Sequence, residues 1–258
     1  MPDAYRQPGN LARSRRNIVK AAAILTGALS SLPLVSRVAS AQSRPTTSAR
    51  CFLRGTGIRT LNGYRPVECL SVGDVLPTAF AGFAPIREIR HFCNKRQDRG
   101  EAWPLDVRPI RIRRSAIEDN VPYADLYVSA AHSLYIDGVL VPAWNLVNGT
   151  SVTRDDAEHL DVIEYFHIVL DQHDVIDAEG ALCDTFLESA DQTIMPDDRG
   201  EEYHGTVLPA VCAPIASYRG RRNLLKSRIR SALSPIVDLR RPLDRIRDRV
   251  EERMPTAA

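Results

Sequence analysis

Three absences limit what this sequence can encode. The 258 residues carry 34 Lys and Arg against 32 Asp and Glu, so the chain as a whole has no electrostatic attraction for nucleic acid or for an anionic membrane. Its five cysteines include no CxxC pair, which argues against a zinc site. Its apolar runs are too short and too rich in Ala, Ser and Thr to span a membrane. A composition of 44% hydrophobic and 26% charged residues then indicates one globular domain with appended segments, or at most two small domains.

Residues 1–41 have the composition of an export signal. A basic lead precedes an uncharged, moderately apolar stretch over residues 21–35, and small residues follow at the spacing that a signal peptidase recognises. The paired arginines, with a serine before them and a lysine after them, resemble the twin-arginine export signal. We therefore expect export by the twin-arginine route to the periplasm or the medium; a basic amphipathic helix is the alternative. The residues that carry the prediction are Arg15 and Arg16 in the motif and Ala41 and Gln42 at the cleavage site.

Cys51 stands at the entrance of a region rich in strand and turn signals. Apolar and polar residues alternate on both sides of Asn62-Gly63, which predicts two strands, from Ile58 to Leu61 and from Pro66 to Leu70, joined by a type I′ turn. Asp137-Gly138 marks another hairpin, and similar short runs follow one another at intervals of about ten residues, a spacing typical of an all-β fold. The polar segment 42–50 has too little apolar content to pack and is expected to be a flexible tail.

Several motifs follow one another in a recognisable order. Cys51 opens a Gly-Thr hairpin with Gly73-Asp74 behind it, Ser129-Ala-Ala-His132 lies in the middle, and His173-Asp174 precedes Gly180. This order resembles the Hint module shared by hedgehog autoprocessing domains and inteins, and in particular the bacterial Hint proteins that are neither. The resemblance covers about residues 51–187 and implies an all-β Hint domain there. The opening block is a fairly specific signal, whereas Ser-x-x-His alone is a weak one.

The residues also suggest a reaction. A cysteine that follows a flexible tail can attack the carbonyl of Arg50 through a five-membered ring and convert the Arg50–Cys51 amide into a thioester. Because this exchange is uphill in water, the module must distort the amide and protonate its departing nitrogen, a task suited to an imidazole. The resemblance gives this task to His132 and places Ser129 where the family usually has Thr. The substrate is then the chain itself, the nucleophile that resolves the thioester is unknown, and no cofactor or metal is expected.

The other candidate residues have weaker signals. His173 and Asp174 are candidates for a supporting catalytic role, although such a pair is more often found in a turn. Cys183 lies near the place where a cysteine assists in hedgehog-type domains, without matching the local pattern, and its role stays open. His167 alternates with apolar residues inside a predicted strand and is expected to be structural. For Cys51, Ser129 and His132 themselves, the alternative is a structural role.

The end of the module departs from inteins. Inteins finish with His-Asn, and the matching region from Gly180 to Thr185 has neither residue; Phe166 also stands where many inteins have Asp. Splicing is therefore not expected, and amino-terminal cleavage that releases the segment ending at Arg50 is the predicted reaction, which would make the chain a single-turnover autoprotease. The alternative is a degenerate Hint fold that serves as an exported binding module, with Cys51 and His132 as relics. For a hydrolase that acts on other proteins, we find no oxyanion motif.

The chain changes character after residue 187. An extended connection is expected over residues 188–217, and residues 218–253 then carry twelve Lys and Arg against five Asp and Glu, a net charge of +7. Apolar residues at helical spacing, interrupted near Pro235 and Pro242, predict two basic amphipathic helices. These helices could dock on an anionic membrane surface or a protein partner, or could pack on the β module with a solvated arginine face. No nucleic-acid partner is expected.

Overall fold

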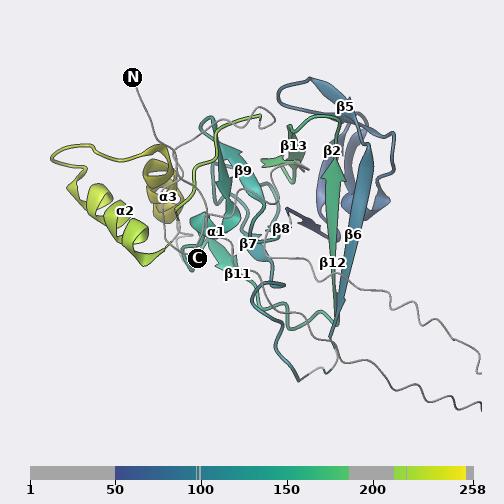
Figure 1. Ribbon diagram of the computed structural model, residues 1–258, viewed down its shortest axis with the longest axis horizontal. Helices are drawn as coiled ribbons and strands as arrows, with labels where there is room; N and C mark the ends of the chain where they lie inside the picture. The colour runs from purple at the N-terminus through teal and green to yellow at the C-terminus, as the bar shows by residue number, and fades with distance from the viewer. Residues whose placement is uncertain (1–49, 97, 99, 186–211, 219, 254–258) are drawn as a thin grey trace, which may run out of the picture. The chain divides into compact units, whose positions relative to one another are not determined.

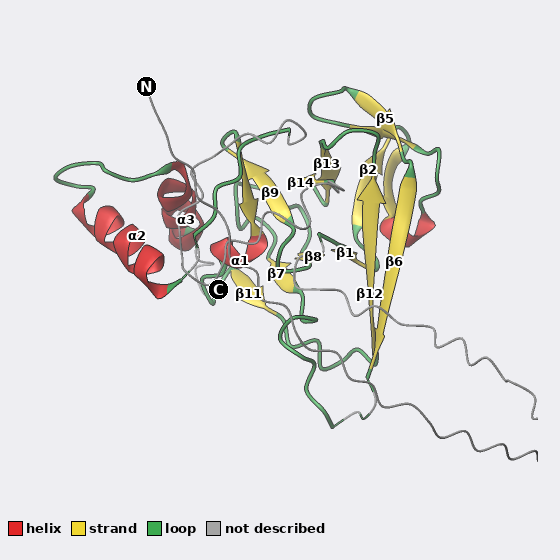
Figure 2. Cartoon of the chain, in the orientation of Figure 1, coloured by secondary structure: helices red, strands yellow, loops and turns green. Residues whose placement is uncertain are grey.

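The computed structural model describes residues 50–96, 98, 100–185, 212–218 and 220–253. The predicted export signal, its cleavage site and most of the extended connection lie outside these residues. The described part is built of strands with helices at its carboxyl end, as Figures 1 and 2 show. Its strands are β1 Phe52–Leu53, β2 Gly57–Thr60, β3 Gly63–Pro66, β4 Val75–Pro77, β5 Phe83–Pro85, β6 Glu88–Lys95, β7 Ile110–Ile112, β8 Leu126–Val128, β9 Ser133–Ile136, β10 Val139–Pro142, β11 Val152–Arg154, β12 Val162–Val169, β13 Val175–Ala178 and β14 Ala181–Asp184. Its helices are the 3₁₀ turn η1 Val67–Cys69, α1 Ala143–Leu146, α2 Arg221–Leu233 and α3 Pro242–Glu252.

The strands form two six-stranded sheets and one two-stranded sheet. One sheet has the order β11-β7-β8-β1-β12-β6, another has the order β10-β9-β14-β13-β2-β3, and β4 pairs with β5. The short strand β1 lies between β8 and β12, antiparallel to both. Because β1 begins at Phe52, the chain enters the sheet at the residue after Cys51, and both neighbouring strands reach the place where the predicted nucleophile stands.

The first hairpin forms, but its turn lies one residue earlier than predicted and its second strand lies elsewhere. Strand β2 ends at Thr60 and β3 begins at Gly63, so Leu61 and Asn62 form the turn. A type I′ turn needs positive φ at both central residues, whereas here the positive value falls at Gly63, with φ of 101°. The predicted second strand, from Pro66 to Leu70, is wrong except at Pro66. The strand that pairs with β2 runs from Gly63 to Pro66, and the chain from Val67 to Cys69 forms the 3₁₀ helix η1. The prediction for Asp137-Gly138 is confirmed: both residues have positive φ and join β9 to β10.

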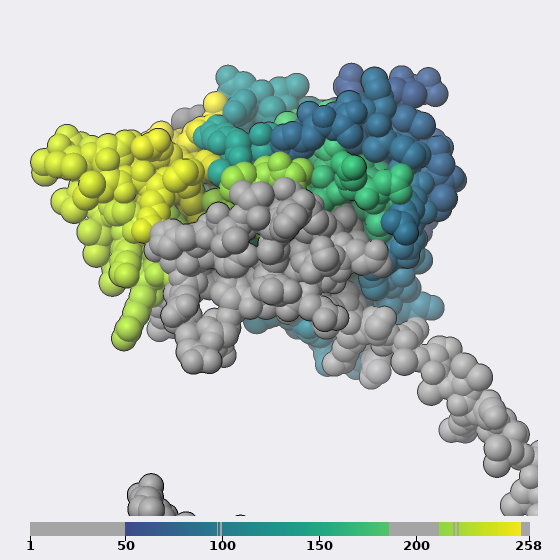
Figure 3. Space-filling view, turned by 45° about the horizontal axis from the view of Figure 1, so that its top comes forward, coloured from purple at the N-terminus to yellow at the C-terminus, as the bar shows by residue number. Residues whose placement is uncertain are grey.

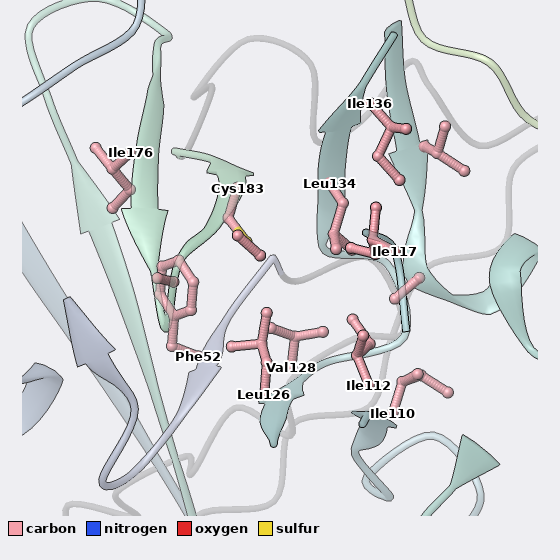
Figure 4. Close-up of a cluster of buried hydrophobic side chains, with 14 of the residues drawn as sticks. Phe52, Ile110, Ile112, Ile117, Leu126, Val128, Leu134, Ile136, Ile176 and Cys183 are labelled. Carbon is pink, nitrogen blue, oxygen red and sulfur yellow. The ribbon is translucent and has the colours of Figure 1, made fainter. Parts of the chain in front are cut away.

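The main hydrophobic core gathers side chains from both large sheets. Figure 4 shows the inward side chains of Phe52, Leu126 and Val128 near those of Leu134 and Cys183. All five side chains are buried. The apolar face of each short strand is therefore covered, and at about 25 cal/mol per Å² of buried apolar area this packing is the main term that holds the strands together.

Helix α3 packs on this core. Its apolar residues Leu243, Ile246 and Val250 recur at helical spacing and are buried in the main cluster. Pro242 occupies the first turn, where its missing N–H leaves no hydrogen bond unmade. Of the two arrangements that the sequence allowed for its carboxyl-terminal helices, packing on the β module holds for α3.

Helix α2 packs differently. It contacts α3 through an ion pair between Arg230 and Asp244, with 2.6 Å between Nε and Oδ2, and it leaves Leu225 and Ile229 exposed. The two helices form one continuous part of the surface in Figure 3, coloured yellow-green and yellow. Among the described residues, no helix is long and apolar enough to cross a membrane. Docking of these helices on an anionic membrane or on a protein stays a prediction.

Candidate functional site

Two hydrogen bonds join Ser129 to the backbone of Cys51. The amide N–H of Cys51, which belongs to the predicted scissile bond, donates a hydrogen bond to Ser129 Oγ at 2.9 Å. In the other direction, the backbone N–H of Ser129 donates to the carbonyl oxygen of Cys51, also at 2.9 Å. Ser129 follows β8, the strand beside β1, so the pairing of these strands sets its place. The hydroxyl is therefore positioned on the nitrogen that would leave during an acyl shift.

The sulfur of Cys51 lies against an imidazole from the strand on its other side. Cys51 Sγ is 3.4 Å from His167 Nδ1, within reach of a hydrogen bond. In β12, Phe166 pairs with Phe52, so the register brings His167 opposite Cys51 on the same face of the sheet. Both side chains are buried. An imidazole in this position can take the proton of the thiol when the sulfur attacks.

The ring of His132 lies in the same buried region. It packs against Phe52, the residue after the predicted nucleophile, with 4.3 Å between the ring centroids. Burial lowers the pKa of His132 to about 4, although the nearby carboxylate of Asp184 acts in the opposite direction. Burial, together with the charges of the neighbouring His132 and Arg90, lowers the pKa of His167 to about 3. Both imidazoles are therefore neutral at neutral pH.

Asp184 is the centre of the charged part of the site. Its Oδ2 lies 3.2 Å from Nη1 of Arg50, the residue before the predicted scissile bond. The Nε2 atoms of His132 and His173 each lie 3.7 Å from its carboxylate oxygens. Burial alone would raise the pKa of Asp184, but the charge of Arg50 and contacts with both histidines lower it to about 2. The carboxylate is thus ionised, and it links the upstream residue to the two imidazoles.

His173 reaches this cluster, whereas Asp174 does not take part in it. The Nδ1 atom of His173 accepts a hydrogen bond from the backbone N–H of Cys212 at 3.1 Å, so Nε2 carries the proton that faces Asp184. The carboxylate of Asp174 accepts backbone N–H groups from Phe80 and Ala81, and from Val175. These hydrogen bonds stabilise a bend of the chain, as expected if Asp174 belongs to a turn. The carboxylate of Asp174 therefore takes no part in the cluster at Cys51.

The structure places Cys183, whose role the sequence left open, in the hydrophobic core. Its thiol is buried in the main hydrophobic core, as Figure 4 shows, and strand alternation turns it away from the face that carries Asp184. Burial raises its pKa well above the ordinary value. Cys212 lies nearer to the cluster, but burial raises the pKa of its thiol to about 12, with a further contribution from the charge of Asp184. Both thiols stay protonated at neutral pH and are poor nucleophiles.

His167 and Asp184 belong to the cluster at Cys51, although no sequence motif predicts a functional role for either. A histidine inside an apolar strand has no signal of its own, because its function depends on which residue the register places opposite. Asp184 stands beside the candidate Cys183, and the period of two along a strand could have directed attention to it. A buried acidic residue in a predicted apolar strand is itself unusual, since ionised side chains are rarely buried without a partner.

A pocket of about 410 Å³ opens beside β1 but does not include Cys51. Its lining includes Leu53, Tyr127 and Asp155. Within the part of the chain that the structure describes, no group of three or more His, Cys, Asp or Glu side chains is arranged to hold a metal ion. The convergent polar groups of the site are therefore those around Cys51 and Asp184, inside the protein and next to the Arg50–Cys51 bond.

Comparison with known proteins identifies the family. A family model described as a Hint domain matches residues 50–190, more than half of the chain. The chain belongs to the Hint domain family. The all-β Hint prediction is thereby confirmed, and the match begins at Arg50, the residue before the predicted nucleophile. No curated protein sequence matches the chain.

Solved structures of inteins and an intein-like domain are similar to the Hint domain. The crystal structure of the gp41-1 intein is 12% identical, with a TM-score of 0.36, and the match covers 53% of this chain and 98% of that one. A DnaB intein from Synechocystis sp. PCC 6803 is 8% identical, with a TM-score of 0.38 and coverage of 54% and 100%. A bacterial intein-like domain from Clostridium thermocellum is 11% identical, with a TM-score of 0.36 and coverage of 53% and 98%.

Proposed function

We propose that this Hint domain cleaves its own chain once, at the bond between Arg50 and Cys51, through a thioester and without splicing. The observation that carries the proposal is the geometry at Cys51. The nitrogen of the scissile bond donates a hydrogen bond to the hydroxyl of Ser129, and the sulfur of Cys51 lies 3.4 Å from Nδ1 of His167. One residue thus has its nucleophilic atom beside a base and its leaving atom beside a hydroxyl, the two requirements of an N-to-S acyl shift.

The shift moves one proton off sulfur and one onto nitrogen. The thiol proton of Cys51 passes to Nδ1 of His167 while Sγ bonds to the carbonyl carbon of Arg50. The bond from that carbon to the nitrogen of Cys51 then breaks, and the nitrogen gains one proton to become an amine. His132 supplies this proton from its protonated form, which the carboxylate of Asp184 favours at 3.7 Å. Because the pKa of His132 is about 4, the protonated form is a minor one at neutral pH, and the reaction is expected to be slow.

Water or an added thiol completes the cleavage. Its oxygen or sulfur bonds to the thioester carbonyl, the bond to Cys51 sulfur breaks, and the sulfur regains a proton. The released segment ends at Arg50, as a carboxylic acid after attack by water. Cys183 and Cys212 are unsuited to this step, because their pKa values are raised. Water or an added thiol is therefore favoured over either of these two cysteines as the resolving nucleophile.

Two observations favour cleavage over splicing and over action on other proteins. The region from Gly180 to Thr185, where the resemblance places the end of the module, has no His-Asn pair, so no asparagine is present there to cyclise. The groups around Cys51 are buried, and Arg50 of the same chain pairs with the carboxylate among them, which suits an internal substrate. An exported binding module with Cys51 as a relic is the competing function, and it makes the opposite prediction in the experiment below.

The test is the intact mass of the purified full chain over time, with and without dithiothreitol. The wild-type protein is expected to yield a fragment that begins at Cys51, faster with the thiol, whereas Cys51→Ala stays whole. Cys69→Ala is the matched control, because Cys69 is an exposed cysteine on η1, and this variant is expected to behave like the wild type. A wild-type chain that stays intact and ignores the thiol would remove the autoproteolytic function and leave the binding module.

A further inference from the structure

The side chain just before the scissile bond is held inside the protein. The side chain of Arg50 is 12% exposed and that of Asp184 is fully buried, with 3.2 Å between Nη1 and Oδ2. A guanidinium is withdrawn from water to this degree only when a counter-charge compensates the lost hydration. Arg50 is thus bound in the manner of a substrate side chain, although it belongs to the same chain.

The carboxylate that binds it is fixed by other contacts. Asp184 Oδ1 accepts the backbone N–H of Ser133 at 2.9 Å, which ties β14 to the start of β9. The imidazoles of His132 and His173 approach the same carboxylate from the two sides. Since these partners come from the folded strands and loops, the carboxylate is oriented independently of Arg50. The site is therefore built to receive a cationic group from the segment upstream of Cys51.

We propose that Asp184 selects the residue at position 50, accepting arginine above lysine and both above neutral side chains. This inference rests on the proposed self-cleavage and adds a specificity for the residue before the scissile bond. Arginine offers a planar fork of donors to a carboxylate, whereas lysine offers a point charge. With Arg50 anchored, its carbonyl carbon is held near the sulfur of Cys51, and small losses of such alignment reduce rates strongly.

Cleavage by residue-50 variants of the full chain tests this specificity. Arg50→Gln is expected to slow cleavage at least tenfold, and Arg50→Lys less. In the Asp184→Asn background, Arg50→Gln should have little further effect, because the partner that distinguishes the two side chains is gone. Arg54→Gln is the matched control: Arg54 is exposed and pairs with Glu164 at the surface, and its loss should leave the rate unchanged. If Arg50→Gln cleaves at the wild-type rate, or if the two substitutions slow cleavage independently, Asp184 does not select the residue.

A second measurement does not need cleavage. In Cys51→Ala chains, urea unfolding of the four combinations of Arg50→Gln and Asp184→Asn gives the coupling between the two side chains. We expect it to reach about tenfold in the folding equilibrium constant, or about 1.4 kcal/mol. If the wild-type chain never cleaves, the proposed function fails, but strong coupling would still establish that Asp184 binds Arg50. Additive effects in this cycle would overturn the inference even if Cys51-dependent cleavage occurs.

Discussion

Cys51 and Cys183 are both fully buried, yet the protein surrounds them with different neighbours. The sulfur of Cys51 lies against a ring nitrogen of His167, next to a backbone amide bonded to Ser129. The side chain of Cys183 is buried in the main hydrophobic core, where burial raises the pKa of its thiol. Burial therefore does not decide whether a thiol is a core residue or a nucleophile. The two environments differ instead in the polar atom within reach of the sulfur, and the proposed function assigns the nucleophile to the thiol that has one.

The two cysteines differ most in what their loss does to cleavage. Cys51→Ala removes the only atom that can form the thioester, so cleavage should fall below detection. Cys183→Ala should cleave like the wild type, because its side chain is buried in the main hydrophobic core and burial keeps its thiol protonated. Intact mass spectrometry after incubation with dithiothreitol compares the two variants directly. Equal loss of cleavage in two folded variants would mean that the distinction drawn from their neighbours is mistaken.

The neighbour that separates the two environments is His167. If its imidazole is the base for Cys51, His167→Gln should slow cleavage by about 10² to 10⁴-fold, the usual contribution of a positioned base. His159→Gln is the control, since His159 is an exposed histidine in the loop before β12. Time courses of the fragment mass measure both variants. If His167→Gln slows cleavage by no more than about twofold, the effect is far smaller than a positioned base would give. His167 would then have the structural role that its strand pattern suggested.

The comparison also shows where sequence reasoning succeeds and where it ends. The order of hairpins, the Asp137-Gly138 turn and the all-β class follow from local residues, because turn chemistry acts within a few positions. Ser129 and His132 came from a motif. The place of His167 depends on the register of β12 against β1, which joins residues more than a hundred positions apart. No local pattern encodes that pairing, so a histidine at the site was assigned to the core.

The histidines at Cys51 also make the stability of the fold depend on pH. The pKa values of His132 and His167 fall from 6.5 to about 4 and about 3 on folding, so the folded state binds fewer protons than the unfolded state below pH 6.5. The stability that comes from keeping these two histidines neutral is therefore fully present above about pH 6.5 and is lost as the pH falls toward 4. Each histidine can contribute up to about 1.4 kcal/mol per pH unit over this interval. Urea midpoints at pH 7 and pH 5 measure the loss, and His167→Gln should reduce it; an unchanged midpoint would contradict the burial of neutral imidazoles.

The smallest expected effect is the change in unfolding free energy when serine replaces either of the two buried cysteines. Cys183→Ser places a hydroxyl in the main hydrophobic core and should destabilise the fold by about 1–3 kcal/mol, the cost of a buried polar group without a partner. Cys51→Ser places the same hydroxyl beside Nδ1 of His167, which can accept its hydrogen bond, so the loss should stay below about 1 kcal/mol. Urea unfolding of both variants at pH 7 isolates this difference, provided that intact mass confirms the chains are uncleaved, because Cys183→Ser keeps the thiol of Cys51. If Cys51→Ser lowers the free energy of unfolding more than Cys183→Ser does, the sulfur of Cys51 is stabilised mainly by apolar packing with Tyr165 and Trp103. The environments of the two cysteines would then be alike.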